Sequence, residues 1–244
     1  MNATPSLSKI LARPDVWCAN RLAAAAIPDI PTISSGFANL DAELPGGGWP
    51  RGALAEILLD GVGLGECSLL LPALRAISDQ ARCTLLLAPL HGVHAPAWSA
   101  AGIDLSRLLI AMPEQRRDTL WAAEHALTSG AIGALLCWTT THIDAAQIRR
   151  LQVAASGSGA LAFLFRPRQA QAQASAASLR LAVSAGTRGT LAVDLLKRRG
   201  PPCTRTLQLA VPRPLPWRED YETPVARPVP ARAAARSLRS LAVA

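Results

Sequence analysis

Lysine, aromatic residues and long hydrophobic runs are all scarce in this chain of 244 residues. Only two lysines occur, Lys9 and Lys197, and aromatic residues make up 4% of the sequence. No apolar run approaches the roughly 18–20 residues that a membrane-spanning helix needs, because the longest, around 84–90 and 131–138, have the length of strands. Charged residues and Pro14 interrupt any signal-peptide core near the N-terminus. We therefore expect no membrane among the partners of this protein.

Cysteine pairs of the kind that bind metals are also missing. The five cysteines are scattered, odd in number and nowhere spaced as C-x-x-C, which favours reduced, mostly buried thiols in the cytoplasm. His91 and His94 have the spacing of half a metal site, but no Cys or carboxylate lies beside them at ligand spacing. The sequence therefore predicts no metal centre.

Half of the residues are hydrophobic and 17% are charged, which is the composition of a globular protein. The charge is polarised along the chain. Residues 1–144 carry 9 basic and 13 acidic groups, whereas residues 145–244 carry 16 basic and 4 acidic groups. This pattern indicates an anionic partner, either DNA bound weakly and without sequence preference or an acidic protein surface. An arginine-rich proteome is the alternative, because 23 of the 25 basic residues are Arg. The candidate contacts are Arg149, Arg150, Arg166, Arg168, Arg180, Lys197, Arg198 and Arg199.

The pattern of strands and helices divides the chain into three parts. We expect an N-terminal helical arm at 1–30 and an α/β core at 31–211. We expect residues 212–244 to form a Pro/Arg-rich, disordered tail. The core predicts a doubly wound, mostly parallel sheet with antiparallel edge strands. Its expected strands are 53–59, 83–88, 108–112, 132–138 and 160–165, with edge strands at 179–184, 189–196 and 205–211. Its expected helices are 66–82, 96–101, 117–129 and 144–155, and 166–178 is expected to be a loop.

The tail offers candidate anchors for a protein partner. Trp217, Arg218 and Tyr221 are of the residue types that tend to dominate interfaces. Arg236, Leu238 and Leu241 belong to a last stretch, 231–244, that fits a small basic helix. We expect a docking tail that orders on its partner, and a passive linker is the alternative.

A glycine-rich loop follows the first strong strand and precedes a helix, which is where P-loop proteins bind nucleotide phosphates. Gly61, Gly63 and Gly65 are present, but Glu66 stands where the P-loop has Lys, and Cys67 stands where it has a Mg²⁺-binding hydroxyl. Two unit charges about 4 Å apart interact by about 4 kcal/mol at an effective dielectric of about 20. Replacing Lys by Glu therefore turns an attraction of that size toward phosphate into a repulsion. The Glu66 carboxylate instead complements the helix N-terminus. We therefore expect a degenerate phosphate loop without a nucleotide cofactor.

With these elements placed, the chain resembles the RecA superfamily over roughly 33–211. The resemblance lies in 33–41, 44–52, 56–57, 83–89, 102–104, 108–113 and 125–130. Within that superfamily, Trp17, the segments 43–50 and 69–74, and the Pro/Arg tail are most similar to the ImuA family. Under this resemblance the RecA catalytic Glu falls at Pro89 and the Walker B Asp at Trp138. Three parts of the ATPase apparatus are then missing, which implies a protein that is not an enzyme.

The resemblance to the ImuA family implies an accessory protein of damage-induced translesion DNA synthesis. Its expected partner is an ImuB-like polymerase, with ImuC and RecA as further partners. A SulA-like inhibitor of cell division, binding a tubulin-like GTPase, is the alternative within the same wider group. An active recombinase fails because the P-loop lysine is missing.

Overall fold

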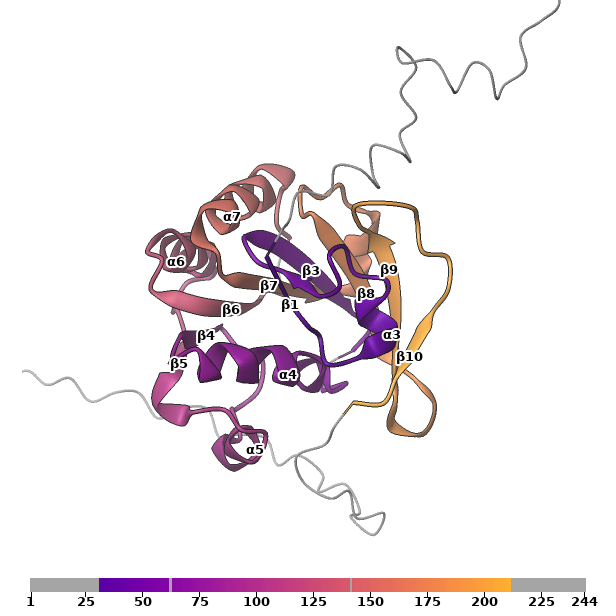
Figure 1. The fold of residues 1–244 in the computed structure, drawn as a ribbon. Helices are drawn as coiled ribbons and strands as arrows, with labels where there is room; N and C mark the ends of the chain where they lie inside the picture. Colours follow the sequence, from indigo (N-terminus) through magenta and orange to yellow (C-terminus); the bar gives the residue numbers. More distant parts are fainter. Residues whose placement is uncertain (1–30, 62, 141, 212–244) are drawn as a thin grey trace, which may run out of the picture.

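The computed structural model describes residues 31–61, 63–140 and 142–211. The predicted N-terminal arm and C-terminal tail lie outside these residues. Figure 1 shows a central sheet with helices on both of its faces. The described region is therefore a three-layered α/β fold, as the alternation of strands and helices predicts.

Eight strands form the central sheet: β3 (Ala53–Leu59), β4 (Cys83–Leu87), β5 (Leu108–Ala111), β6 (Ile132–Trp138), β7 (Leu161–Pro167), β8 (Leu179–Ala185), β9 (Leu191–Lys197) and β10 (Leu207–Leu209). Their order is β10-β9-β8-β3-β7-β6-β4-β5. The strands from β8 to β5 are mutually parallel, whereas β9 is antiparallel to both β8 and β10. A mostly parallel sheet with an antiparallel edge is thus confirmed. At the opposite edge, β5 leaves Leu109 and Ile110 exposed.

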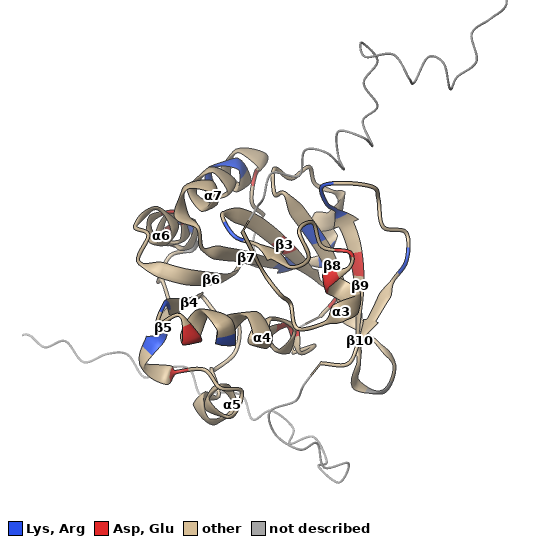
Figure 2. Ribbon diagram, in the orientation of Figure 1, with Lys and Arg blue, Asp and Glu red and all other residues tan. Residues whose placement is uncertain are grey.

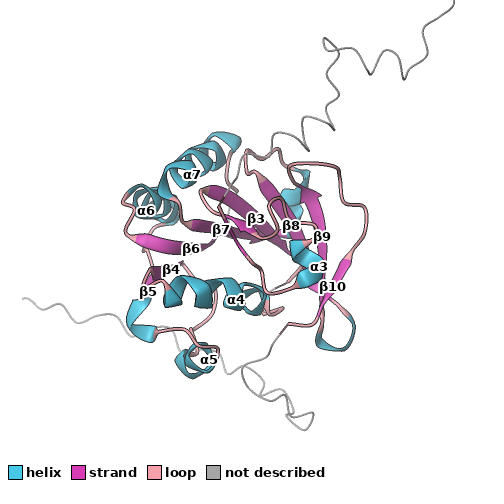
Figure 3. Cartoon of the chain, in the orientation of Figure 1, coloured by secondary structure: helices cyan, strands magenta, loops and turns pink. Residues whose placement is uncertain are grey.

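Helices cover both faces of this sheet (Figure 3). α3 (Ala38–Asp41), α4 (Glu66–Asp79) and α5 (Ala95–Ala100) pack on one face, and α6 (Arg116–Thr128) and α7 (Ala145–Ser158) pack on the other. Three short 3-10 turns lie at Leu105–Arg107 (η1), Arg168–Ala172 (η2) and Thr187–Gly189 (η3). A separate small sheet pairs β1 (Thr32–Ile33) with β2 (Trp49–Pro50) in antiparallel register. Among the described helices, none has the length and apolarity to cross a membrane.

Alternation along β3 divides its side chains between two cores. Ile57 belongs to the core beneath α4, where the Trp49 indole meets the Phe163 ring edge-on at 5.2 Å between centroids. Leu54 points to the other face and shares a second core with Ile148 of α7. Both faces of the central strands are therefore covered. All residues of β6 are buried, as its continuous apolar run predicts.

α7 begins where the sequence predicts but ends later. Asp144 Oδ1 accepts a hydrogen bond from the Gln147 N–H at 2.7 Å, and Gln147 Oε1 accepts one from the Asp144 N–H at 3.0 Å. This reciprocal pair is a capping box, and it satisfies amide groups that the first turn leaves free. The helix continues to Ser158, beyond the predicted end at 155, and stops at Gly159, whose φ of 63° no longer fits a right-handed helix.

α4 ends before the predicted residue 82. Its last residue is Asp79, and Ala81 has a φ of 58°, which a right-handed helix cannot accommodate. Arg82 then turns toward the start of β6, where its Nη2 donates to the carbonyls of Gly130 at 2.8 Å and Ile132 at 2.6 Å. These contacts join the segment after α4 to the start of β6.

The prediction that the edge strands are all antiparallel is wrong for the first of them. β8 runs parallel to β3 and is antiparallel only to β9. The reason is that β7 continues to Pro167 and the segment after it, which includes η2, carries the chain across β3 before β8 begins. The predicted loop at 166–178 therefore begins only after Pro167, and residues 168–178 form a crossover connection between two parallel strands.

The β6 backbone approaches α4 so closely that a methyl group at Gly133 has no room. A Cβ there would lie 2.5 Å from Arg82 Cβ and 2.7 Å from Ile77 Cγ2. Gly133→Ala is expected to destabilise the fold by about 1–3 kcal/mol through overpacking, measured by urea denaturation. Gly157→Ala is the control, because nothing lies within 4 Å of a Cβ at that helical position. It should leave stability unchanged or raise it by up to about 1 kcal/mol, and equal losses in both variants would contradict the explanation.

Candidate functional site

The glycine-rich loop joins the end of β3 to the start of α4, as the sequence predicts. Gly65 is the N-cap residue of α4 and has a φ of 97°, a conformation that favours glycine. Gly61 and Gly63 precede it in the same loop. The strand, loop and helix of a phosphate-binding site are therefore present, and its chemistry depends on the side chains at the helix start.

Glu66 occupies the N-terminus of α4 with its own carboxylate. The side chain is buried, and its Oε2 accepts a hydrogen bond from the Gly65 N–H at 3.1 Å. An anion thus already binds a loop amide beside the positive end of the helix dipole, as we expected from the sequence. A phosphate placed against the same amide would meet a like charge.

Cys67 follows Glu66 and packs against the core beneath α4. Burial and the neighbouring Glu66 carboxylate raise the pKa of this thiol to about 12. Thiols act as nucleophiles and metal ligands in the thiolate form, so Cys67 is unreactive near neutral pH. Within the described residues, no group of three or more His, Cys, Asp or Glu side chains is arranged to hold a metal ion.

A pocket of about 220 Å³ opens beside the loop, where β3, β6 and β7 end. This edge is where ligands bind in open parallel sheets. In its wall the Trp138 indole stacks on the Phe165 ring, with centroids 4.6 Å apart and an interplanar angle of 13°. Trp138 is the position to which the resemblance assigns the Walker B acid. Among the described lining residues, Asp60 supplies the carboxylate and Arg166 the cation.

Arg166 is bound into a buried cluster behind this pocket. Its Nη1 donates to Glu56 Oε1 at 2.5 Å, and Arg180 Nε donates to Glu56 Oε2 at 2.6 Å. The Glu56 side chain is fully buried, and the side chains of Arg166 and Arg180 are 1% and 10% exposed. The second amino group of Arg166 donates to Gln173 Oε1 at 2.6 Å, which ties the crossover segment to the sheet.

The prediction that Arg166 and Arg180 contact DNA or an acidic partner is wrong. β7 and β8 flank β3, and their register places Arg180 opposite Glu56 and Arg166 opposite Leu58 on the same face of the sheet. Both guanidinium groups therefore neutralise the buried carboxylate of Glu56. The sequence holds one signal of this, because Glu56 interrupts an apolar strand and a buried carboxylate needs a cation.

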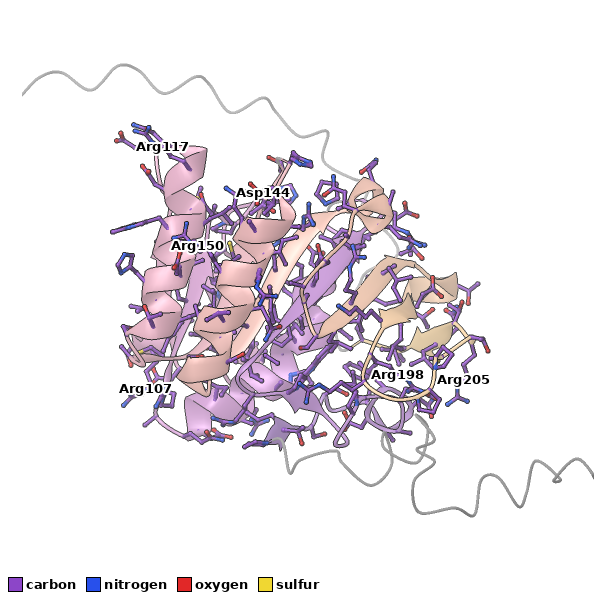
Figure 4. All side chains as sticks on the ribbon, turned by 90° about the horizontal axis from the view of Figure 1, so that it is seen from above. Arg107, Arg117, Asp144, Arg150, Arg198 and Arg205 are labelled. Atoms are coloured by element: carbon purple, nitrogen blue, oxygen red, sulfur yellow. The ribbon has the colours of Figure 1, made fainter. Side chains whose placement is uncertain are left out.

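The other basic candidates lie on the surface, and several are engaged. Arg150 pairs with Glu124 at 2.5 Å, Arg168 with Asp194 at 3.8 Å, and Lys197 Nζ donates to the Ser175 carbonyl at 2.9 Å. Arg149 and Arg199 are exposed and form no ion pair with any described residue. These residues do not form one continuous edge. Figure 2 shows basic residues on α7 and on the loop after β9 as separate groups. Figure 4 shows Arg150 and Arg198 well apart.

Arg198 belongs to a smaller cluster that holds the basic turn after β9. Arg198 Nη1 lies 2.6 Å from one carboxylate oxygen of Glu43, and Arg205 Nη2 lies 2.5 Å from the other. The hydrogen bonds from Arg205 and then Arg198 hold the pKa of Glu43 below its ordinary value of 4.5. The turn is thereby fastened to the segment that follows α3.

The predicted tail contacts Trp217, Arg218, Tyr221, Arg236, Leu238 and Leu241 lie outside the described residues.

Comparisons with known proteins match this core. The family model of the cell division inhibitor SulA matches residues 54–162. RecA of Picosynechococcus is 34% identical over 119 residues, which are 48% of this chain and 33% of that protein. RecA of Chloroherpeton thalassium is 33% identical over 119 residues, covering 48% and 32%. The RecA of Lactococcus lactis subsp. cremoris strain MG1363 is 29% identical over 112 residues, covering 46% and 29%.

Both matches support a RecA/SulA-like superfamily. The mainly parallel sheet and its antiparallel edge agree with a RecA-like fold. The chain spans about a third of the length of the RecA proteins it matches. The family model begins within β3 and ends at the start of β7, so it includes the glycine loop but not the pocket residues that β7 and η2 contribute.

Removing the buried carboxylate is expected to be costly. Glu56→Gln leaves two buried guanidinium groups without a counter-ion and should destabilise the protein by about 3–5 kcal/mol. Glu124→Gln is the matched control, because it breaks the surface pair with Arg150 and should cost no more than about 1 kcal/mol. Urea denaturation of both variants measures the difference. If both variants lose similar, small amounts of unfolding free energy, the Glu56 cluster contributes no more to stability than a surface ion pair.

The low pKa of Glu43 predicts a pH dependence of stability. A carboxyl whose pKa is lower in the folded state contributes stability above its unfolded pKa, and that contribution is lost as the pH falls through the folded pKa. Wild type should therefore exceed Glu43→Gln in stability at neutral pH, and the gap should close below about pH 4. Thermal unfolding over this range measures it. A gap that stays constant would contradict the assignment.

Proposed function

We propose that this protein is a non-catalytic accessory factor of damage-induced translesion DNA synthesis that scaffolds an ImuB-like polymerase. The observation that carries the proposal is Glu66, whose carboxylate binds the loop amide at the position where a P-loop protein has its lysine. The SulA and RecA matches support a role related to the SOS response and DNA damage. The ImuA-like segments then favour translesion synthesis within that role.

A scaffold of this kind needs a core that is stable without a nucleotide. Glu66 supplies the anion at the start of α4, and the Trp138–Phe165 stack lies in the wall of the adjacent pocket. Neither feature requires ATP to complete it. The tail, with Trp217 and Tyr221, is the proposed docking element for the polymerase, and the net positive charge of residues 145–244 would give weak DNA affinity that falls with salt.

A SulA-like inhibitor of cell division is the second candidate function. The observation that favours it is the match of the SulA family model to residues 54–162. The partner in that case is a tubulin-like GTPase. The Pro/Arg-rich tail distinguishes the two proposals, because the polymerase proposal gives that segment a role.

The purified protein is expected to hydrolyse no ATP above the buffer rate in the presence of Mg²⁺. Glu66→Lys restores the missing charge but should remain inactive, because Pro89 and Trp138 stand at the positions assigned to the two acids. Hydrolysis by wild type and by Glu66→Lys is measured with a phosphate-release assay, and ATP binding is measured as the shift in Tm on adding ATP. Mg²⁺-dependent hydrolysis by wild type that is lost in Glu66→Ala would refute the proposal of a non-catalytic core.

Affinity purification from damage-treated cells distinguishes the two candidate functions. Full-length protein, a truncation after Val211 and the full-length variant Trp217→Ala are compared by quantitative mass spectrometry. Recovery of an ImuB-like polymerase by full length alone supports both the function and the docking tail. Recovery by all three keeps the function and moves the interface to the core, and recovery of a tubulin-like GTPase instead supports the SulA-like alternative.

A further inference from the structure

The outer face of α6 carries an exposed tryptophan. Trp121 is 59% exposed, and its indole packs against the His125 ring one turn further along, with centroids 4.2 Å apart. On the neighbouring helix α7, Val153 is 64% exposed. Large apolar side chains that stay exposed on two adjacent helices indicate a surface for a partner.

A groove runs along the seam between these two helices. Its larger part has a volume of about 500 Å³ and is lined by Glu124, Thr128, Ala146, Arg149, Arg150, Val153, Ala154 and Gly157. A smaller hollow of about 120 Å³ is lined by Arg117, Leu120, Trp121, Glu124, Gln147, Arg150 and Leu151. Both contain Glu124 and Arg150, so they adjoin each other. We call their combined surface the α6/α7 groove.

The charges of this groove favour an acidic occupant. The side chains of Arg117 and Arg150 are 80% and 66% exposed (Figure 4), and each has one carboxylate within reach. Arg117 lies 3.6 Å from Asp118, and Arg150 lies 2.5 Å from Glu124. Arg149 is exposed and has no ion-pair partner among the described residues, so one positive charge on the groove remains uncompensated.

The form of the groove favours a protein segment over nucleic acid. Ala146, Val153, Ala154 and Gly157 make much of its lining apolar, which suits side chains rather than a hydrated backbone. The carboxylate of Glu124 lies inside it and would repel a continuous row of phosphates. A helix can instead place separated carboxylates beside the arginines and its apolar side chains between them.

We propose that the α6/α7 groove docks an acidic, amphipathic helix of a protein partner. Its apolar side chains pack on Trp121 and Val153, and its carboxylates pair with Arg117, Arg149 and Arg150. Tryptophan and arginine are the residues that most often dominate such interfaces. The inference rests on the proposed scaffolding function and assigns the polymerase a contact on the core as well as on the tail.

Two single substitutions in the full-length protein test this contact, one that shortens a side chain and one that reverses a charge. Binding to the purified ImuB-like polymerase is the measurement. Trp121→Ala and Arg149→Glu should each weaken binding by about five-fold or more. Arg199→Glu is the matched control, because Arg199 is also exposed and lies outside the groove, and it should bind like wild type. If wild type binds and the groove variants bind equally well, the inference fails and the scaffolding function stands. If wild type does not bind, the scaffolding function fails.

Photocrosslinking in damage-treated cells tests the groove independently of that probe. Benzoylphenylalanine replaces Val153 in one full-length variant and Arg199 in a control, and the crosslinked peptides are sequenced. Crosslinks at position 153 to a segment rich in carboxylates and apolar residues, absent at position 199, support the inference. Crosslinks to nucleic acid, to a second copy of this chain or to nothing overturn it.

Discussion

The carboxylate of Glu56 and the two arginines that bind it hold the centre of the fold together. A charge on the middle strand of a sheet, buried on both faces, must be neutralised within the structure, because its loss of hydration costs several kcal/mol. Arg166 and Arg180 supply that neutralisation from the two neighbouring strands, β7 and β8. Arg180 also donates to the Ala170 carbonyl at 2.9 Å, so the crossover segment between those strands is bound to the same cluster. The cluster therefore links β7, β3 and β8 to one another, and Arg166 also lines the pocket.

The C-terminal end of β3 leads into the glycine-rich loop, where the Glu66 carboxylate takes the place of a bound phosphate. Glu66 binds the Gly65 amide from within the helix it begins, and the neighbouring thiol of Cys67 stays protonated because of burial and that charge. The loop connects the sheet to α4, and we propose that it does so without a nucleotide, although its geometry is that of a phosphate-binding loop. A core whose loop amide is bound by its own Glu66 needs no ligand to complete it and is suited to present surfaces to partners. The α6/α7 groove and the tail are the two surfaces we propose.

Much of the fold could be predicted because local patterns agree with the tertiary structure. The apolar run of β6, the Asp144 and Gln147 pair at the start of α7, and the glycines before α4 each match an observed element. The prediction failed at β8 and at Arg166 and Arg180. A strand shows the same alternation of polar and apolar residues whether its polar side chains reach water or a buried counter-ion. The pattern alone therefore suggests a surface strand in both cases. Only the position of Glu56 on the adjacent strand separates the two cases.

The sequence by itself determined most strands and helices of the main sheet and the exchange of Lys for Glu66 in the loop, because periodicity, capping residues and residue identity are local properties. Tertiary structure decided which charges are available. It buried Arg166 and Arg180 against Glu56 and fastened Arg198 to Glu43, and it left Arg149 exposed on α7 and Trp121 exposed on α6. The physical reason is that a charge binds whichever opposite charge the fold brings within a few ångströms, and that distance depends on strand order and helix packing across the whole core.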